Sequence, residues 1–286
     1  MNFYLLKPRA SDYSVRCGDW DRNDDDEAFE YQERTVSEMV QHPRYNHDKI
    51  GSILYRNNIA VLFFDEEFNL DKHIDTICLP DVEPNYEESD CFVTGWGKKT
   101  GNGDYQDAMK QIRMDLQDRD TCLNNIRSFA GLKYPQRYKL DDSKMCAYSP
   151  DKDDTCYGDG GGALVCKDKN QDRYVQMCRT EAQLTLKILQ LRYKFNSRYL
   201  MAGLTSQSVL ECGQENVPGL YVSVSHERCF ISYVTKCKKG DKYQRFINNE
   251  LEACKTFIDD EIKRSEAEEE ISGFQDEIRK LKDQCE

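Results

Sequence analysis

One short stretch of the chain combines glycines, carboxylates and cysteines in the manner of a reactive loop. Residues 154–166 read Asp-Thr-Cys-Tyr-Gly-Asp-Gly-Gly-Gly-Ala-Leu-Val-Cys, with four glycines among the five positions from 158 to 162. Glycine lacks a Cβ, so the backbone can take a positive φ there and present its N–H groups to a carbonyl oxygen. Covalent attack on that carbonyl also needs a side-chain nucleophile. Gly160, in the middle of the run, offers only a hydrogen atom.

Three further motifs accompany this loop. Residues 91–97 read Cys-Phe-Val-Thr-Gly-Trp-Gly, residues 77–80 read Ile-Cys-Leu-Pro, and residues 217–222 read Val-Pro-Gly-Leu-Tyr-Val. Together with the glycine loop they resemble the trypsin-like serine proteases over most of residues 14–235. In that family a serine nucleophile stands where this chain has Gly160. The resemblance implies an all-β fold, the trypsin-like double β-barrel.

The resemblance also implies that the catalytic triad is lost. Residues 57–62, Asn-Asn-Ile-Ala-Val-Leu, match the family's Asn-Asp-Ile-Ala-Leu-Leu, so Asn58 occupies the position of the aspartate that orients the catalytic histidine. Nothing before Val15 matches the family's opening strands and histidine loop, so we expect the first barrel to be incomplete. The remaining histidines fall outside the triad position and are expected to be ordinary surface or turn residues: His42, His47, His73 and His226.

Binding is the part of the family's chemistry that can survive. By resemblance, the backbone N–H groups of Gly158 and Gly160 are the oxyanion-hole donors, which without a nucleophile can only bind a carbonyl. Asp159 matches a buried carboxylate that pairs with a new amino terminus in active relatives. Without that partner, we expect Asp159 to be solvent-accessible, protonated or bonded to other groups.

A pocket for basic side chains is weakly supported. Asp154 matches the family's specificity position at the base of a pocket that favours Arg or Lys, and residues 206–208 match its walls. Gln207 removes an aromatic wall, and Ser208 narrows an entrance that glycine leaves open, while Ser206 is retained. These replacements argue against a working pocket.

A narrower resemblance indicates the biological setting. Residues 15–21, Val-Arg-Cys-Gly-Asp-Trp-Asp, and the Gly-Asp-Gly-Gly loop resemble the arthropod clip-domain serine protease homologues, which are non-catalytic proteins of innate immunity. This implies a secreted adaptor or cofactor in a proteolytic cascade of the prophenoloxidase type, with extracellular proteases or their protein substrates as partners. Two alternatives stay open. One is an active trypsin-like endopeptidase, for which Thr155 is the nearest hydroxyl in sequence; the other is a truncated or mispredicted fragment without independent function.

Composition excludes several other classes. The formal net charge of -12 argues against nucleic acid and anionic membrane surfaces as partners, because both require a basic face. No apolar run is long enough to span a membrane. No cofactor motif is present. The carboxylates of residues 19–30 lack the glycine and spacing of a calcium loop, so we expect a solvated acidic loop and no metal site.

The cysteines predict a secreted protein. Thirteen cysteines without metal-ligand spacing indicate a disulfide framework. Residues 1–11 contain no apolar signal segment, so we expect that the true amino terminus is missing. By resemblance the bridges are Cys122–Cys146, Cys91–Cys166 and Cys156–Cys212, and Cys78 lacks an evident partner in this chain. Spacing does not pair the others, which are Cys17, Cys178, Cys229, Cys237, Cys254 and Cys285.

Several segments carry further expectations. Strands are expected at 50–65, 90–97 and 108–118. Residues 177–201 intervene where, in the family, one strand runs directly into the next. Their apolar spacing fits a partner-binding helix, and a retained non-coding segment or gene-model error explains them at least as well. Residues 238–286 are predicted to form a helical tail, either a short coiled coil that self-associates or a surface helix that docks on its own domain or stays partly disordered.

Overall fold

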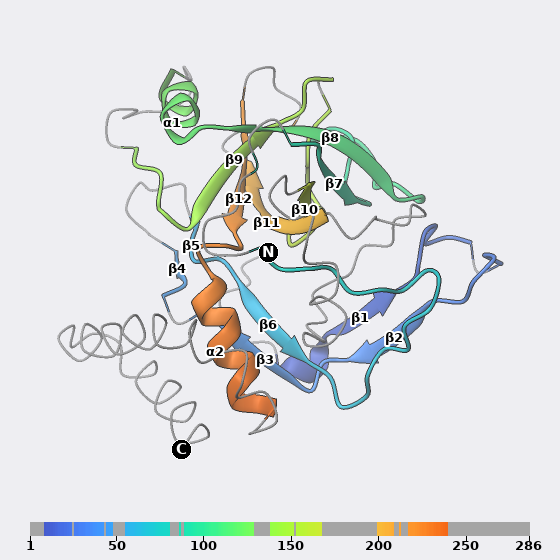
Figure 1. The fold of residues 1–286 in the computed structure, drawn as a ribbon. Coiled ribbons are helices and arrows are strands. Elements are labelled where there is room, and N and C mark those ends of the chain that lie inside the picture. Colours follow the sequence, from blue (N-terminus) through green and yellow to red (C-terminus); the bar gives the residue numbers. More distant parts are fainter. Residues whose placement is uncertain are drawn as a thin grey trace.

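A closed six-stranded β-barrel forms the centre of the protein. The computed structural model describes residues 9–24, 26–42, 44–47, 55–80, 86, 89–128, 138–151, 153–167, 199–208, 212 and 217–239. The barrel, in the upper half of Figure 1, has the order β10-β11-β12-β9-β8-β7, and every neighbouring pair is antiparallel. Its strands are β7 (Cys91–Gly95), β8 (Lys110–Gln117), β9 (Lys144–Tyr148), β10 (Ala163–Lys167), β11 (Tyr199–Ser208) and β12 (Gly219–Ser223).

The core of the barrel explains why these residues form strands. β10 and β12 carry four consecutive buried residues each, which is typical of strands that are covered on both faces. Leu164 and Tyr221 are fully buried in one cluster that fills the barrel. Val165 and Val222 belong to a second cluster, on which the carboxy-terminal helix packs through Ile231.

The first half of the described chain forms three two-stranded sheets and no closed barrel, in agreement with the expected incomplete first barrel. Its ladders pair β1 with β2, β3 with β6 and β4 with β5. The short helix η1 (Ala10–Asp12) precedes them. The strands are β1 (Ser14–Cys17), β2 (Gln32–Thr35), β3 (Glu38–Gln41), β4 (Asn46–His47), β5 (Tyr55–Arg56) and β6 (Ala60–Phe63).

The prediction of one continuous strand at 50–65 is wrong, because a break separates β5 from β6. Asn57 has a φ of 44°, in the left-handed region, where a regular strand cannot continue. The break is fixed by a hydrogen bond from the Asn57 N–H to Ser143 Oγ, at 3.0 Å. Asn58 therefore lies in the turn rather than in a strand.

Two helices complete the described chain. In α1 (Arg119–Ser128), Cys122 and Ile126 are buried, and the Asp118 carboxylate caps the first turn by accepting the Thr121 N–H at 2.9 Å. α2 (Arg228–Lys239) runs alongside β6 and β3 in Figure 1. No helix in the described part is long and apolar enough to cross a membrane. The predicted helical tail lies outside the described residues from 240 onward.

The three bridges implied by resemblance are confirmed: Cys91–Cys166, Cys122–Cys146 and Cys156–Cys212. Each stabilises the fold by about 2–4 kcal/mol through restriction of the unfolded chain. Cys78 is also disulfide-bonded, so the expectation that it lacks a partner is wrong. The family pattern alone does not identify the disulfide partner of Cys78.

The unusual segment at 177–201 extends less far than the sequence indicated. Tyr199, Leu200 and Met201 belong to β11 and pair with Lys167, Cys166 and Val165 of β10. These three residues are therefore part of the barrel ladder. The rest of the segment lies outside the described residues.

Candidate functional site

The glycine loop is a compact turn before β10. Gly158 and Gly161 have φ values of 99° and 80°, which side chains with a Cβ rarely adopt. The Asp159 N–H donates to the Cys156 carbonyl at 3.0 Å, and the Gly162 N–H donates to the Asp159 carbonyl at 2.9 Å. The loop thus closes on itself around Asp159.

The Asp159 carboxylate is held by backbone donors. One oxygen accepts the Gly97 N–H at 2.8 Å, and the other accepts the Cys156 N–H at 2.9 Å. A Cβ at Gly95 or at Gly97 would overlap with this carboxylate, which explains why glycine is required at both positions. The prediction that Asp159 bonds to other groups is confirmed.

Backbone hydrogen bonds also attach the loop to β11. The Gly161 N–H donates to the Thr205 carbonyl, and the Thr205 N–H donates to the Gly162 carbonyl, both at 2.8 Å. This pairing places the glycines beside Ser206, the next residue of the strand. The glycine loop and one of the predicted pocket-wall residues therefore belong to one site.

Two backbone donors remain open in this loop. The Lys98 N–H donates to the Tyr157 carbonyl at 2.9 Å, and in a trans peptide the following N–H, that of Gly158, points the opposite way. Within the described part of the chain, neither the Gly158 N–H nor the Gly160 N–H meets an acceptor. Both residues are exposed. A ligand carbonyl oxygen can accept hydrogen bonds from such donors.

The position of the family's nucleophile is empty space. A Cβ built at Gly160 would have no heavy atom within 4 Å. Gly160 is also not among the glycines with positive φ. A side chain would therefore fit, so the absence of a nucleophile is a property of the sequence and not of crowding.

Two exposed tyrosines flank the open donors. Tyr157 is 62% exposed and Tyr105 is 52% exposed. The Tyr105 ring lies against Gly158, because a Cβ there would be 2.7 Å from Tyr105 Cε1. The Lys98 ammonium sits 5.2 Å from the centre of the same ring, within cation–π range. Aromatic side chains of this kind are enriched in protein interfaces.

Within the part of the chain that the structure describes, Asn58 contacts Ser206 and no histidine. Asn58 Nδ2 donates to Ser206 Oγ at 3.2 Å, and Lys144 Nζ donates to the same oxygen at 2.6 Å. Lys144 is 3% exposed, and its burial lowers the pKa of the ammonium to about 8, against the raising effect of Asp141 and Glu227. Sequence reasoning missed Lys144, whose only signal is a charged residue at a buried position of β9.

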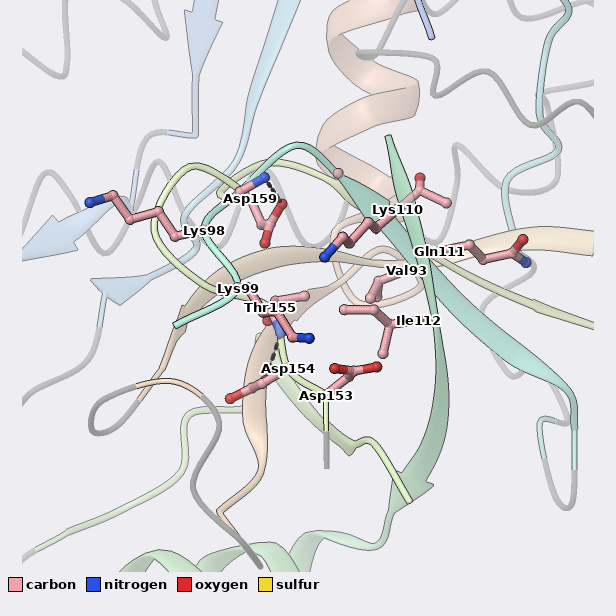
Figure 2. Close-up of a pocket in the computed structure, with 13 residues that line it drawn as sticks. Val93, Lys98, Lys99, Lys110, Gln111, Ile112, Asp153, Asp154, Thr155 and Asp159 are labelled. Atoms are coloured by element: carbon pink, nitrogen blue, oxygen red, sulfur yellow. Dashed lines mark hydrogen bonds between the residues drawn. The ribbon is translucent and has the colours of Figure 1, made fainter. Parts of the chain in front are cut away.

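A cavity adjoins Asp154, at the position of the predicted pocket for basic side chains. A cavity of about 260 Å³ is lined by both carboxylates and lysines, among them Asp153, Asp154, Asp159, Lys98, Lys99 and Lys110 (Figure 2). The lysines come from the loop after β7 and from the start of β8. Ser206 does not line this cavity, and the side chains of Gln207 and Ser208 lie outside the described residues. A pocket for basic side chains stays a prediction.

Thr155 is poorly placed to replace the missing nucleophile. It is 7% exposed, and its hydroxyl lies 3.4 Å from the Tyr221 hydroxyl. Burial raises the pKa of Tyr221, so this phenol stays protonated and cannot accept a proton from Thr155.

His42 is a turn histidine, as expected, but it is buried and paired. His42 Nδ1 accepts the Arg44 N–H at 3.0 Å, so Nε2 carries the hydrogen of the neutral ring, and this nitrogen lies 3.3 Å from Glu227 Oε2. Asn57 Nδ2 donates to the other carboxylate oxygen at 2.9 Å. Burial lowers the pKa of His42 to about 3 and raises the pKa of Glu227 to about 7.

The barrel, the glycine loop and the disulfides together define a protein of the chymotrypsin and trypsin class. Residues 6–231 match the protein-family model described as Trypsin, and the chain therefore belongs to the trypsin family. Among solved structures it is similar to neuropsin, a serine protease from mouse brain, with a TM-score of 0.57 and 20% identity over 80% of this chain and 83% of that one. This likeness supports the fold alone.

Two of the similar curated proteins come from insects. The chain is 30% identical to phenoloxidase-activating factor 2 of Galleria mellonella, over 78% of this chain and 63% of that protein. It is 31% identical to inactive CLIP domain-containing serine protease A28 of Anopheles gambiae, over 75% of this chain and 47% of that protein. It thus spans between about half and two thirds of the length of these relatives.

Proposed function

We propose that this protein is a non-catalytic serine protease homologue that acts as an adaptor or cofactor in an extracellular proteolytic cascade. The observation that carries the proposal is the structure of the loop around Gly160. The loop keeps open N–H donors and an empty side-chain position, but it has no nucleophile. Such a loop can bind a peptide carbonyl and cannot form an acyl intermediate with it.

Asn58 supports the same conclusion. An amide cannot supply the negative charge that stabilises a protonated catalytic histidine. In this protein its donor hydrogen instead bonds to Ser206, which a lysine also contacts. In active serine proteases, loss of the nucleophile or of the base alone lowers turnover by about 10⁶-fold.

The setting of the proposal comes from the relatives and the disulfides. One relative is named for phenoloxidase activation and another is named inactive, which favours a cofactor role in a cascade of the prophenoloxidase type. Three bridges within the described residues fit a secreted protein. We propose an extracellular protease or its protein substrate as the partner, bound beside the exposed Tyr105 and Tyr157. We also propose that the protein self-associates through the predicted helical tail at residues 238–286.

A reconstituted cascade tests this function. Prophenoloxidase and its activating protease are mixed with and without the purified protein, and phenoloxidase activity is recorded. We expect the protein to raise the activity while having no effect on prophenoloxidase alone. Tyr157→Ala should weaken the effect, whereas Tyr13→Ala, at another exposed tyrosine far from the loop in sequence, should not. An unchanged activity over a wide range of protein concentration contradicts the proposed role.

A further inference from the structure

A serine hydroxyl, a buried amine and an amide meet at the edge of the glycine loop. From this arrangement we propose that Ser206 is an acyl-acceptor site, with Lys144 as the base that takes its proton and Asn58 as a donor to the developing alkoxide. The reagents it takes are activated esters and comparable electrophiles. This reactivity is independent of the adaptor role and does not amount to peptide cleavage.

The geometry supplies the contacts that proton transfer needs. Lys144 Nζ and Ser206 Oγ are 2.6 Å apart, within direct hydrogen-bond reach. Asn58 Nδ2 lies 3.2 Å from the same oxygen, where its N–H stabilises negative charge. Lys144 on β9 and Ser206 on β11 are positioned by the closed barrel, and Asn58 reaches them from the turn before β6, which lies outside the barrel.

The base, Lys144, is more deeply buried than the nucleophile, Ser206, which favours reaction at the serine. Lys144 is 3% exposed, so its amine is shielded from reagents in solution. Ser206 is only partly buried, so it is the more exposed residue of the pair. An electrophile should therefore meet the serine before the lysine.

The charge of Lys144 depends on its surroundings. Burial lowers the pKa of its ammonium to about 8, while the carboxylates of Asp141 and Glu227 raise it. Glu227 itself lies 3.3 Å from His42 Nε2 and accepts a hydrogen bond from Asn57 Nδ2. With a pKa of about 8, roughly a tenth of the lysines are neutral at pH 7 and the majority above pH 8. The neutral fraction is the form that can act as a base.

With an ester as the reagent, the acyl group is transferred to Ser206. Neutral Lys144 takes the hydroxyl proton, Ser206 Oγ bonds to the carbonyl carbon, and the bond from that carbon to the leaving oxygen breaks. The leaving oxygen receives the proton from the Lys144 ammonium. An amide nitrogen is a far poorer leaving group, which is why we expect single acylation by activated reagents and no peptidase turnover.

A fluorophosphonate probe tests the site. Ser206 Oγ bonds to phosphorus, fluoride leaves, and the serine proton passes through Lys144 to solvent. Peptide mapping of the labelled protein should find the adduct on Ser206, with a rate that rises between pH 7 and pH 9 with its midpoint near 8. Ser206→Ala should abolish the adduct. Ser223→Ala is the matched control, because the partners of that hydroxyl among the described residues are the Ser225 hydroxyl at 3.0 Å and the His226 backbone N–H at 3.4 Å, and neither is a lysine amine.

Two substitutions of Lys144 distinguish a role as a base from a role as a nearby positive charge. Lys144→Arg keeps the charge but cannot lose its proton, and Lys144→Met keeps the volume without charge. Both should lower the labelling rate by about 10²-fold, with thermal unfolding used to verify that each variant is folded. Absence of a Ser206 adduct in the wild-type protein between pH 6 and pH 10, or an unchanged rate in a folded Lys144→Arg variant, overturns the proposal.

Discussion

The Asp159 carboxylate accepts the Gly97 N–H at 2.8 Å, and this bond joins the glycine loop to the turn after β7. A methyl group at Gly97 would overlap with the carboxylate. We therefore expect Gly97→Ala to destabilise the protein by about 1–3 kcal/mol through overpacking. Gly101→Ala is the control, since its Cβ would touch only Tyr157, at 3.8 Å. Urea unfolding of both variants measures the difference, and equal midpoints would contradict this account of Asp159.

The buried pair of His42 and Glu227 predicts an unusual pH dependence. Glu227 has a folded pKa of about 7, above its unfolded value, so its stabilising contribution is complete below about pH 4.5 and is lost as the pH rises through 7. His42 has a folded pKa of about 3, below its unfolded value of about 6.5, so its contribution is lost as the pH falls below 6.5. Between about pH 4.5 and 6.5 the two slopes oppose each other.

Glu227→Gln separates these two contributions. Glutamine keeps the shape and cannot titrate, so only the His42 slope remains. We expect the variant to lose stability on acidification from pH 6.5 to 4.5 by up to about 1.4 kcal/mol per pH unit, more steeply than the wild type. Urea unfolding at half-unit pH steps measures both slopes. Parallel curves for the two proteins would show that the pair does not titrate as described.

Restoring two family residues should not restore peptide cleavage. Gly160→Ser places a hydroxyl in open space, and Asn58→Asp restores a carboxylate. However, Lys144 shares the Ser206 oxygen with residue 58, so it would attract that carboxylate, and the described residues place no histidine beside it. We expect a folded double variant without measurable hydrolysis of an arginine peptide amide. Hydrolysis above the wild-type background would show that a base is available after all.

Contiguous motifs made much of this protein predictable. The glycine loop and the motif at residues 91–97 are contiguous in the sequence, and the family resemblance that they carry implied the barrel and the three disulfides. The contacts of Lys144 with Ser206 and of His42 with Glu227 were not predicted, because each joins residues of ordinary type that are far apart in the chain. The break at Asn57 was missed because its left-handed φ is set by Ser143, which lies on another segment.

The absence of peptidase activity is the claim on which the proposed function depends most. Its direct measurement is the hydrolysis rate of a fluorogenic arginine peptide amide, followed through successive purification steps alongside the amount of protein. We predict that any hydrolysis separates from the protein and that the pure material shows none. Hydrolysis that stays proportional to the protein at every step, and that disappears in the Ser206→Ala or Thr155→Ala variant, would contradict the account.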